Sequence, residues 1–485
     1  MSQASQIFRN TSVLAAARLF ERGANLVIAF VISRRAGAAG LGLYATAIAY
    51  FQVIALAGEM GSTNLLTREI AKDRSQTSSY VVHASILAGG LSLAATAVAW
   101  FVIPHLGYSG ELQAGLMVIV LAVLPGTLNT IQEAAFVAHQ RVELETLTTL
   151  VASLVLVVAS TILLVQGHGV VSLLVAFVVV EFVVTLVYFH LINRKICALH
   201  WEFQWERARA LIREIRAFAG SSLIAGFCAR PEVILLSMLG SEVQVGYYTA
   251  ALKVVDLWQF LPQTFMINVF PVLSRSYHAN DGRAEEIQHR STTYLLAVGL
   301  PIAVGLGITA GPVITTLYGA DFEPAVVVLR VLAATVVLFC LIGVLWRVLA
   351  ARGEQALVLR VQVVSLVARL AAGCLLIAGF AANGAAAANL GGLAVFTLLL
   401  AAGVRRRGGR LRLLADNWRF AAAALVMGLS VAALAGIGVG LWGLAAAGTV
   451  VYAAAVVALR ALSPEDAASL RRLVPGSRVR ARVDA

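Results

Sequence analysis

The sequence reads VVSLLVAFVVVEFVVTLVYFHLI from Val170 to Ile192, with Glu181 as the one charged residue in the stretch. About 20 apolar residues in a helix cross the hydrocarbon core of a bilayer. A spanning segment must satisfy its backbone hydrogen bonds internally, so the predicted structure is a helix. Arg194 and Lys195 follow almost at once, and basic residues mark the cytoplasmic end of a span. The stretch therefore predicts a transmembrane helix that ends in the cytoplasm.

The whole chain has the composition of a membrane protein. Of its 485 residues, 60% are hydrophobic and 13% are charged, and the mean hydropathy is +0.86. Soluble domains carry about 25% charged residues. The four cysteines are scattered, and the eight histidines form no metal-binding motif. We therefore expect no disulfide framework, no metal and no cofactor.

Stretches of spanning length recur along almost the entire chain, which predicts an all-α polytopic membrane protein with about fourteen transmembrane helices. No segment is left over for a catalytic domain, so we expect a protein that is not an enzyme. The predicted spans are 10–33, 40–60, 80–103, 113–138, 147–166, 170–192, 215–240, 244–272, 291–318, 324–349, 356–379, 384–404, 419–437 and 439–460.

The placement of basic residues predicts the orientation of these spans. Of the 37 Lys and Arg residues, 28 lie in the termini, in the connections that follow even-numbered spans and at adjoining span ends. Only Arg34 and Arg35 lie in the opposite connections. By the positive-inside rule both termini are cytoplasmic, and we expect a multi-pass membrane protein. The net charge of +12 is then a topology signal, and no nucleic-acid partner is required.

An internal repeat predicts the domain organisation. The segment Gly42–Ala47 (GLYATA) matches Gly246–Ala251 (GYYTAA), and weaker matches follow at a similar shift. Two halves of six spans each have the same orientation, which predicts two bundles related by a pseudo-twofold axis along the membrane normal. The predicted parts are an N-terminal bundle (1–192), a cytoplasmic linker (193–214), a C-terminal bundle (215–404), two additional spans (405–460) and a basic cytoplasmic tail (461–485).

The linker contains an amphipathic segment. Ala208, Leu211, Ile212 and Ile215 share one face at helical spacing, and arginines occupy the other face. This pattern predicts an interfacial helix that leads into the seventh span.

Ionisable residues inside the predicted spans are the candidate functional groups, because charges at bilayer depth are costly. For an anionic head group the candidate cations are Arg18, Arg22, Arg230, Lys253 and Arg369. The candidate coupling or ion-pair acids are Glu21, Glu133, Glu181, Glu232 and Asp256. A local ion pair such as Lys253 with Asp256 is the alternative interpretation. Arg230 also precedes Pro231, which predicts a weak point in its helix.

Several short motifs resemble those of a known family. The first half contains Arg34-Arg-Ala-Gly37, Gly40-Leu-Gly-Leu-Tyr44 and Leu66-Thr-Arg-Glu69, and the second half contains Val245–Lys253 and Leu317-Tyr-Gly319. This pattern is similar to bacterial polysaccharide-export flippases, which are lipid-linked oligosaccharide translocases of the multidrug/oligosaccharidyl-lipid/polysaccharide exporter superfamily. The resemblance covers nearly the whole chain.

The resemblance implies a function. The substrate would be a polyprenyl-diphosphate-linked sugar unit, moved from the cytoplasmic to the outer leaflet by alternating access through a cationic cleft. Its partners would be membrane lipids and the glycosyltransferases and polymerase of the same pathway. The alternatives are a multidrug or small-molecule secondary exporter of the same superfamily and a flippase for a lipid-linked peptidoglycan precursor. No phosphate-binding loop occurs, so energy would come from an ion gradient, the membrane potential or substrate consumption.

Overall fold

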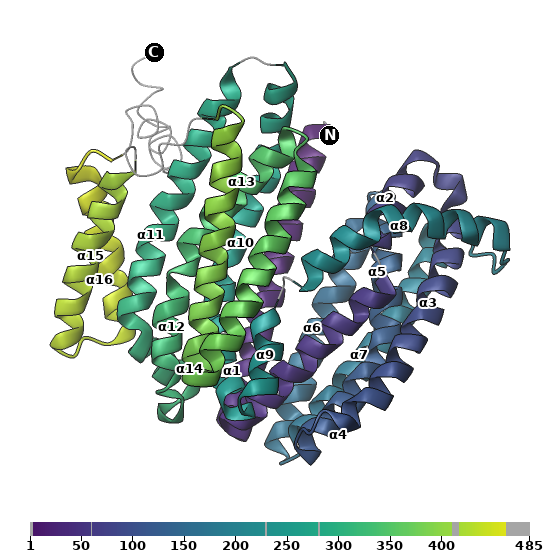
Figure 1. The fold of residues 1–485 in the computed structure, drawn as a ribbon, viewed down its shortest axis with the longest axis horizontal. Helices are drawn as coiled ribbons and strands as arrows, with labels where there is room; N and C mark the ends of the chain where they lie inside the picture. The colour runs from purple at the N-terminus through teal and green to yellow at the C-terminus, as the bar shows by residue number, and fades with distance from the viewer. Residues whose placement is uncertain (1–2, 60, 228–229, 280–281, 410–416, 462–485) are drawn as a thin grey trace, which may run out of the picture. The chain divides into compact units, whose positions relative to one another are not determined.

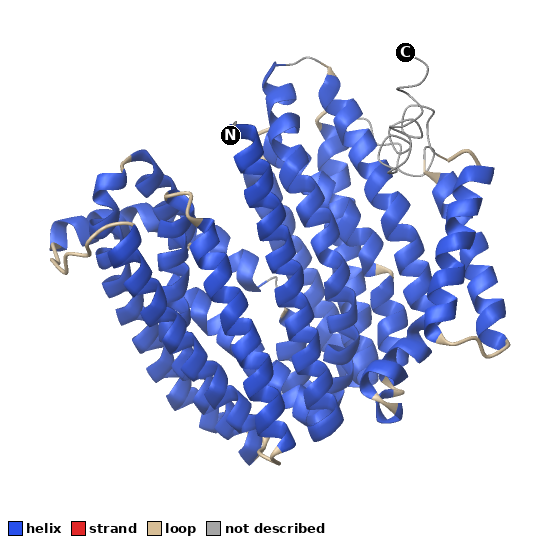
Figure 2. Cartoon of the chain, turned by 180° about the vertical axis from the view of Figure 1, so that it is seen from behind, coloured by secondary structure: helices blue, strands red, loops and turns tan. Residues whose placement is uncertain are grey.

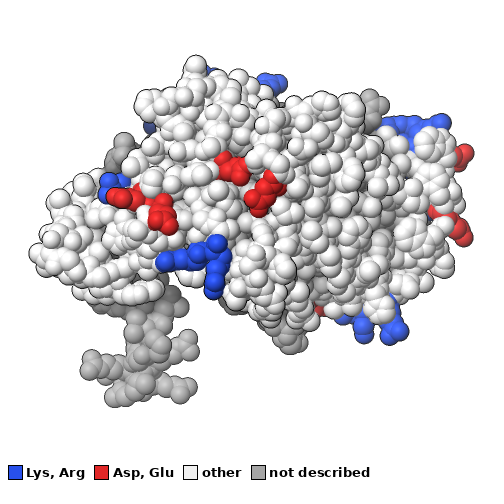
Figure 3. Space-filling model, turned by 90° about the horizontal axis from the view of Figure 1, so that it is seen from below, with Lys and Arg blue, Asp and Glu red and all other residues white. Residues whose placement is uncertain are grey.

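The computed structural model describes residues 3–59, 61–227, 230–279, 282–409 and 417–461, and these form helices and loops with no strand among them (Figure 2). Ten of the helices in this described part are long and apolar enough to cross a membrane. The predicted class, an all-α multi-pass membrane protein, is confirmed. In a space-filling view, uncharged surface predominates and charged side chains occur in small groups (Figure 3).

The chain divides into two compact units. The first comprises residues 1–260, 314–332 and 354–399, and the second comprises residues 261–313, 333–353 and 400–485. The helices up to the second half of the chain are α1 (Gln3–Glu59), α2 (Ser62–Lys72), α3 (Thr77–Val102), α4 (Gly110–Ile119), α5 (Val123–Ala138), α6 (Val142–Val165), α7 (Val170–Lys195), α8 (Trp205–Phe227) and α9 (Pro231–Leu239). They are followed by α10 (Glu242–Ala279), α11 (Arg283–Tyr318), α12 (Ala325–Ala333), α13 (Thr335–Ala351), α14 (Gln355–Arg406), α15 (Trp418–Gly436) and α16 (Leu441–Ala458). Short 3₁₀ turns occur at Arg74–Gln76, Ile103–His105, Val120–Ala122 and Ala320–Phe322.

Two of the long helices each contain two predicted spans. In α1 the backbone is non-helical at Gly37 (φ 67°, ψ −164°), and in α14 it is non-helical at Ala381 (φ 47°, ψ −121°). Figure 1 shows that α1 changes direction along its length. Both residues fall in the connections predicted between spans 10–33 and 40–60 and between spans 356–379 and 384–404. The prediction of a break is therefore confirmed at both positions.

The predicted seventh span, 215–240, is interrupted in the structure. Helix α8 ends at Phe227 and α9 begins at Pro231. Proline is favoured at the first position of a helix, where its missing N–H costs nothing. With nine residues, α9 is only about 14 Å long, too short to cross a bilayer alone. The weak point predicted at Pro231 is thus a helix boundary.

Helix α8 joins the predicted amphipathic segment to the start of this span in one continuous helix. Ala208, Leu211 and Ile215 are buried, as the periodicity predicts, whereas Ile212 is 39% exposed. Leu211 and Ile215 pack into a hydrophobic cluster formed by residues of α2, α3, α5 and α7. The buried face of α8 is therefore narrower than predicted, because Ile212 lies at its edge.

The second unit contains the last two helices, which match the predicted spans 419–437 and 439–460 closely. Phe420 and Ala423 of α15 pack against Val456 of α16, with Leu300 of α11 at the edge of the cluster. The hydroxyl of Tyr452 donates to the carbonyl oxygen of Ala297, at 2.6 Å. These contacts attach the α15–α16 pair to α11 within the unit. The assignment of the other spans to two six-helix bundles stays a prediction.

Candidate functional site

A cavity of about 530 Å³ lies within the first unit, lined by residues of helices α1, α5, α6, α7, α9 and α10. Seven of the ten predicted site residues line it. These are the basic residues Arg22, Arg230 and Lys253 and the acidic residues Glu21, Glu133, Glu181 and Asp256. The lining therefore carries both signs of charge, whereas the sequence predicted a cationic cleft.

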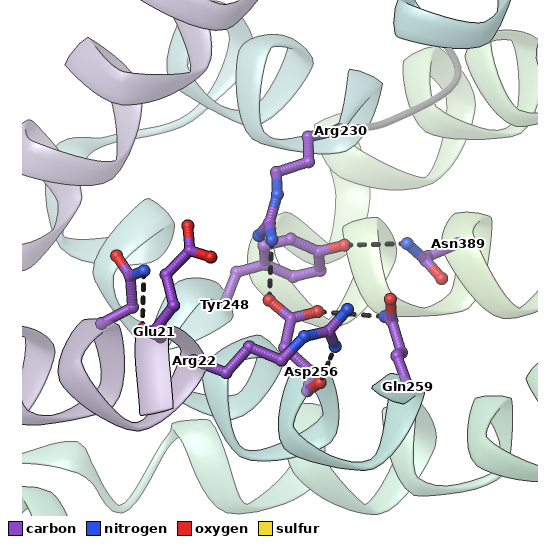
Figure 4. A network of polar contacts seen from close by, with 8 residues as sticks. Glu21, Arg22, Arg230, Tyr248, Asp256, Gln259 and Asn389 are labelled. Atoms are coloured by element: carbon purple, nitrogen blue, oxygen red, sulfur yellow. Dashed lines mark hydrogen bonds and ion pairs between the residues drawn. The ribbon is translucent and has the colours of Figure 1, made fainter. Parts of the chain in front are cut away.

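Asp256 of α10 is the centre of a polar network in this cavity (Figure 4). Its Oδ2 atom pairs with a guanidinium nitrogen of Arg230 at 2.7 Å, and its Oδ1 atom accepts a hydrogen bond from Nε2 of Gln259 at 3.0 Å. Arg22 of α1 donates to the backbone carbonyl oxygen of Asp256. Two arginines from different helices thus converge on one residue.

The interruption between α8 and α9 positions Arg230. This residue precedes the first turn of α9 and has a non-helical backbone (φ −148°, ψ 51°). Its side chain is 32% exposed and that of Asp256 is 15% exposed, so the ion pair is open to the cavity. The local ion pair considered for Lys253 and Asp256 is not formed among the described residues. The acid pairs with Arg230 because the start of α9 brings that guanidinium over α10.

The acids on α5 and α7 belong to a second network. Asn129 donates through Nδ2 to Oε2 of Glu181 at 2.7 Å, and its Oδ1 accepts from the hydroxyl of Thr185 at 2.7 Å. Glu133 lies one turn after Asn129 and also lines the cavity, with no hydrogen bond to the side chain among the described residues. Oδ1 of Asn129 is the nearest of three oxygen atoms within reach of the Thr185 hydroxyl, the others being the carbonyl oxygens of Glu181 at 2.9 Å and Pro125 at 3.2 Å. When it donates to Asn129, the hydroxyl of Thr185 orients the amide that holds Glu181.

Glu232 and Arg369 form a separate ion pair and are absent from the cavity lining. Nε and NH2 of Arg369 on α14 bind the two carboxylate oxygens of Glu232 on α9 at 2.6 and 2.7 Å. The side chains are 8% and 1% exposed. Bidentate pairing of this kind satisfies both charges inside the protein. The binding and coupling roles considered for these two residues stay predictions.

The two remaining candidates lie on α1. Glu21 lines the cavity, and its backbone carbonyl accepts a hydrogen bond from Asn25 at 3.0 Å. Arg18 is part of α1, but its side chain lies outside the described residues.

Aromatic and neutral polar side chains complete the lining, and sequence reasoning did not single them out. Phe51 and Phe177 meet edge to face with ring centroids 5.4 Å apart. The neutral polar residues of the lining include Asn25, Gln52, Asn129, Thr130, Thr149 and Ser153. The only signal for these residues in the sequence is a polar residue inside a predicted span. That signal does not indicate which face of the helix lines a cavity. In the described part of the chain, no group of three or more His, Cys, Asp or Glu residues is placed to hold a metal ion.

Two family models match the chain. A model described as polysaccharide biosynthesis protein matches residues 5–327. A model described as lipid II flippase MurJ matches residues 257–457. Among curated proteins, the chain is 26% identical over 196 residues to the probable low-salt glycan biosynthesis flippase Agl15 of Haloferax volcanii. That match covers 40% of this chain, and the chain spans 42% of the length of that relative.

Several solved structures share the fold. The lipid II flippase MurJ in an inward closed conformation matches with a TM-score of 0.78 at 16% identity, over 92% of this chain and 99% of that chain. An inward-facing multidrug resistance transporter of the MATE family matches with a TM-score of 0.67 at 17% identity, over 81% of this chain and 94% of that chain. A transporter of the MOP superfamily from Pyrococcus furiosus matches with a TM-score of 0.59 at 16% identity, over 84% of this chain and 96% of that chain. At these identities the likeness shows a common fold.

Proposed function

Because the chain belongs to the polysaccharide biosynthesis protein family of the multidrug/oligosaccharidyl-lipid/polysaccharide exporter superfamily, we propose that it is a flippase for a polyprenyl-diphosphate-linked oligosaccharide. It carries this substrate from the cytoplasmic to the outer leaflet by alternating access. The observation that carries the proposal is the placement of Arg22, Arg230 and Lys253 around one cavity inside a membrane protein.

The three basic side chains suit the diphosphate. Guanidinium groups bind phosphate oxygens through paired hydrogen bonds, and an ammonium group adds a compact charge. Inside a membrane protein such cations are costly unless they face an anion or water. A diphosphate in the cavity supplies that anion. The three cations lie on α1, on α10 and at the start of α9, beside the acids Glu21 and Asp256, and the head group binds there.

The side chains that α5, α7 and the second half of α1 contribute to the lining suit the sugar. The carboxylates of Glu133 and Glu181 on α5 and α7 can accept hydrogen bonds from sugar hydroxyl groups, and Asn129 and Thr130 can donate and accept. The edge-to-face rings of Phe51 and Phe177 offer apolar surface to the carbon face of a sugar ring. A ligand with an anionic end and a hydroxyl-rich end matches this mixed lining better than a purely anionic ligand.

The setting follows from the same proposal. The protein acts in the bacterial cytoplasmic membrane with both termini in the cytoplasm, where glycosyltransferases assemble the substrate. A polymerase on the outer side consumes the product. Members of the family are flippase transporters, and the chemistry of sugar transfer belongs to those partner enzymes.

Two related functions have specific support and are tested beside the first. The match of residues 257–457 to the lipid II flippase model favours a lipid-linked peptidoglycan precursor as substrate. The carboxylates Glu133 and Glu181 favour a small cationic compound, as in a multidrug exporter. Both alternatives keep alternating access and change only the cargo.

The test uses the full chain reconstituted in vesicles that contain a fluorescent, short-chain polyprenyl-diphosphate oligosaccharide. We expect outward movement of this probe, and loss of movement in Arg22→Ala and Arg230→Ala. Arg35→Ala is the control, because Arg35 is exposed and is not part of the cavity lining. Full transport by both cavity variants would exclude the proposal. Transport of a lipid-linked peptidoglycan precursor alone, or of a cationic dye alone, would favour one of the alternatives.

A further inference from the structure

We infer that Asp256 is an internal competitor of the substrate: it occupies Arg230 while the cavity is empty, and the diphosphate must displace it. This inference rests on the proposed function and adds a residue that sets the balance between binding and release. It assigns Asp256 a role different from that of an ion-coupling acid or a structural ion pair.

The first argument is the set of donors around Asp256. Arg230 and Gln259 each bind one carboxylate oxygen, and Arg22 binds the backbone carbonyl oxygen of the same residue. In Figure 4 the two guanidinium groups approach Asp256 from different helices. Both arginines line the cavity, so the groups proposed to receive a diphosphate already hold oxygen atoms of the protein. The carboxylate thus stands where a phosphate oxygen would bind.

The second argument is a comparison with the other ion pair of α9. Glu232, two residues after Arg230, binds Arg369 through both carboxylate oxygens, and the two side chains are 1% and 8% exposed. The Arg230–Asp256 pair is joined by one contact of 2.7 Å, with side chains 32% and 15% exposed. A ligand in the cavity can therefore reach Arg230, while Arg369 is sealed off.

The competition has a consequence for transport. Each diphosphate that binds Arg230 must break the pair with Asp256, which lowers the net affinity. Once displaced, the carboxylate lies near the bound diphosphate, and the two negative charges repel each other. The pair re-forms when the diphosphate leaves. Asp256 therefore weakens binding and favours release, which a carrier needs because uniformly tight binding slows turnover.

The test measures binding and transport in Asp256→Asn, which keeps the size of the side chain and its hydrogen bond to Gln259. The probe is farnesyl diphosphate, a water-soluble polyprenyl diphosphate, titrated into the full chain in lipid nanodiscs. We expect Kd to fall about tenfold, equivalent to 1.4 kcal/mol. In vesicles, both KM and kcat for the lipid-linked oligosaccharide should fall, because release becomes slower. An unchanged or weaker affinity overturns the inference.

Two further variants keep the outcome interpretable. Glu232→Gln is the control, since it should lower the melting temperature without tightening farnesyl diphosphate binding. Gln259→Met removes one hydrogen bond to the carboxylate of Asp256 but keeps the carboxylate. We expect a smaller gain in affinity for farnesyl diphosphate than in Asp256→Asn. This variant serves as the test if Asp256→Asn does not fold. If Arg22→Ala and Arg230→Ala leave probe binding unchanged, the proposed function itself fails. If they weaken binding and neither Asp256→Asn nor Gln259→Met tightens it, only the role of Asp256 fails.

Discussion

Gly42 of α1 and Gly246 of α10 lie at one helix crossing, and each faces the backbone of the other helix. A Cβ atom on Gly42 would overlap the carbonyl oxygen of Glu242, and one on Gly246 would overlap the carbonyl oxygen of Ala38. A shift of 204 residues relates Ala38 to Glu242 and Gly42 to Gly246. The contact is therefore reciprocal. The sequence match of these segments has a structural counterpart here.

This crossing predicts that neither glycine tolerates a methyl group. Gly42→Ala and Gly246→Ala should each reduce stability by about 1–3 kcal/mol, because the overlapping atoms belong to the backbone and cannot rotate away. Thermal unfolding of the detergent-solubilised protein measures the effect. Gly90→Ala in α3 is the matched control, since a Cβ there meets nothing within 4 Å. An equal loss of stability in Gly90→Ala would contradict the explanation.

The buried ion pair of Glu232 and Arg369 predicts that a substitution of one partner alone strongly lowers the stability of the protein. Arg369→Gln should destabilise the protein by about 3–5 kcal/mol, because it leaves a buried carboxylate without its partner. The double variant Glu232→Leu with Arg369→Met should recover most of this loss. Arg290→Gln breaks the exposed pair with Glu286 and should cost less than about 1 kcal/mol. Equal melting temperatures for Arg369→Gln and Arg290→Gln would refute the prediction.

The hydrogen bonds from Thr185 to Asn129 and from Asn129 to Glu181 predict that a substitution of Thr185 affects transport, although Thr185 is not part of the cavity lining. Thr185→Val keeps the shape of the side chain but leaves Oδ1 of Asn129 without its donor, at a cost of about 1–3 kcal/mol. We also expect slower transport, because the amide that holds Glu181 is no longer oriented. Thr185→Ser retains the hydroxyl and should retain transport. Slower transport in Thr185→Ser as well would point to packing instead.

The side chain of Arg34 is expected to stabilise the C-terminal end of α11. It donates to the carbonyl oxygens of Thr316 at 2.8 Å and Leu317 at 3.4 Å, in the last turn of that helix, whose carbonyls lack helical partners. Arg34→Ala should reduce stability by about 1–2 kcal/mol. Arg35→Ala, at the next position and exposed, should change stability by less than about 0.5 kcal/mol. Urea or thermal unfolding compares the two, and equal effects would exclude the capping role.

The surroundings of His139, in the short connection after α5, predict that the stability of the protein depends on pH. Burial and the nearby charge of Arg74 lower its pKa, and its ring nitrogen Nε2 bonds the hydroxyl of Thr77 at 2.8 Å. A lowered pKa in the folded state means that the unfolded chain binds the proton more readily. Stability should therefore decrease as the pH falls below the ordinary histidine pKa and through the lowered value. His139→Gln should make the melting temperature less sensitive to pH over this range. If the melting temperature of the variant depends on pH as strongly as that of the wild type, His139 is not the group responsible.

Much of the fold follows from local patterns. Long apolar stretches predicted the helices, and the short connections between them predicted the breaks at Gly37 and Ala381, because chain reversal requires a non-helical residue. The proline rule predicted a weak point at Pro231, whereas the interruption of the predicted span 215–240 was not predicted. Each of the predicted features depends on neighbours in the sequence, which explains why a single sequence is sufficient.

The pairing of charges did not follow in the same way. Asp256 has Lys253 one turn away, yet it pairs with Arg230, 26 residues earlier in the chain. Glu232 and Arg369 are 137 residues apart, and Asn129 holds Glu181 across 52 residues. Helical spacing identifies which side chains share a face but not which face of another helix they meet. Distinguishing a sealed ion pair from an open one therefore needed the three-dimensional packing.

The distance along the chain between Glu232 and Arg369 also concerns how the protein is made. At typical rates of synthesis of 5–20 residues per second, roughly 7–27 s pass between the two residues leaving the ribosome. Throughout that interval the carboxyl group of α9 has no guanidinium partner from α14. In a nascent chain shorter than about 370 residues, burial of the Glu232 carboxylate is therefore costly, and the ion pair that satisfies it in the folded protein can form only after α14 has been synthesised.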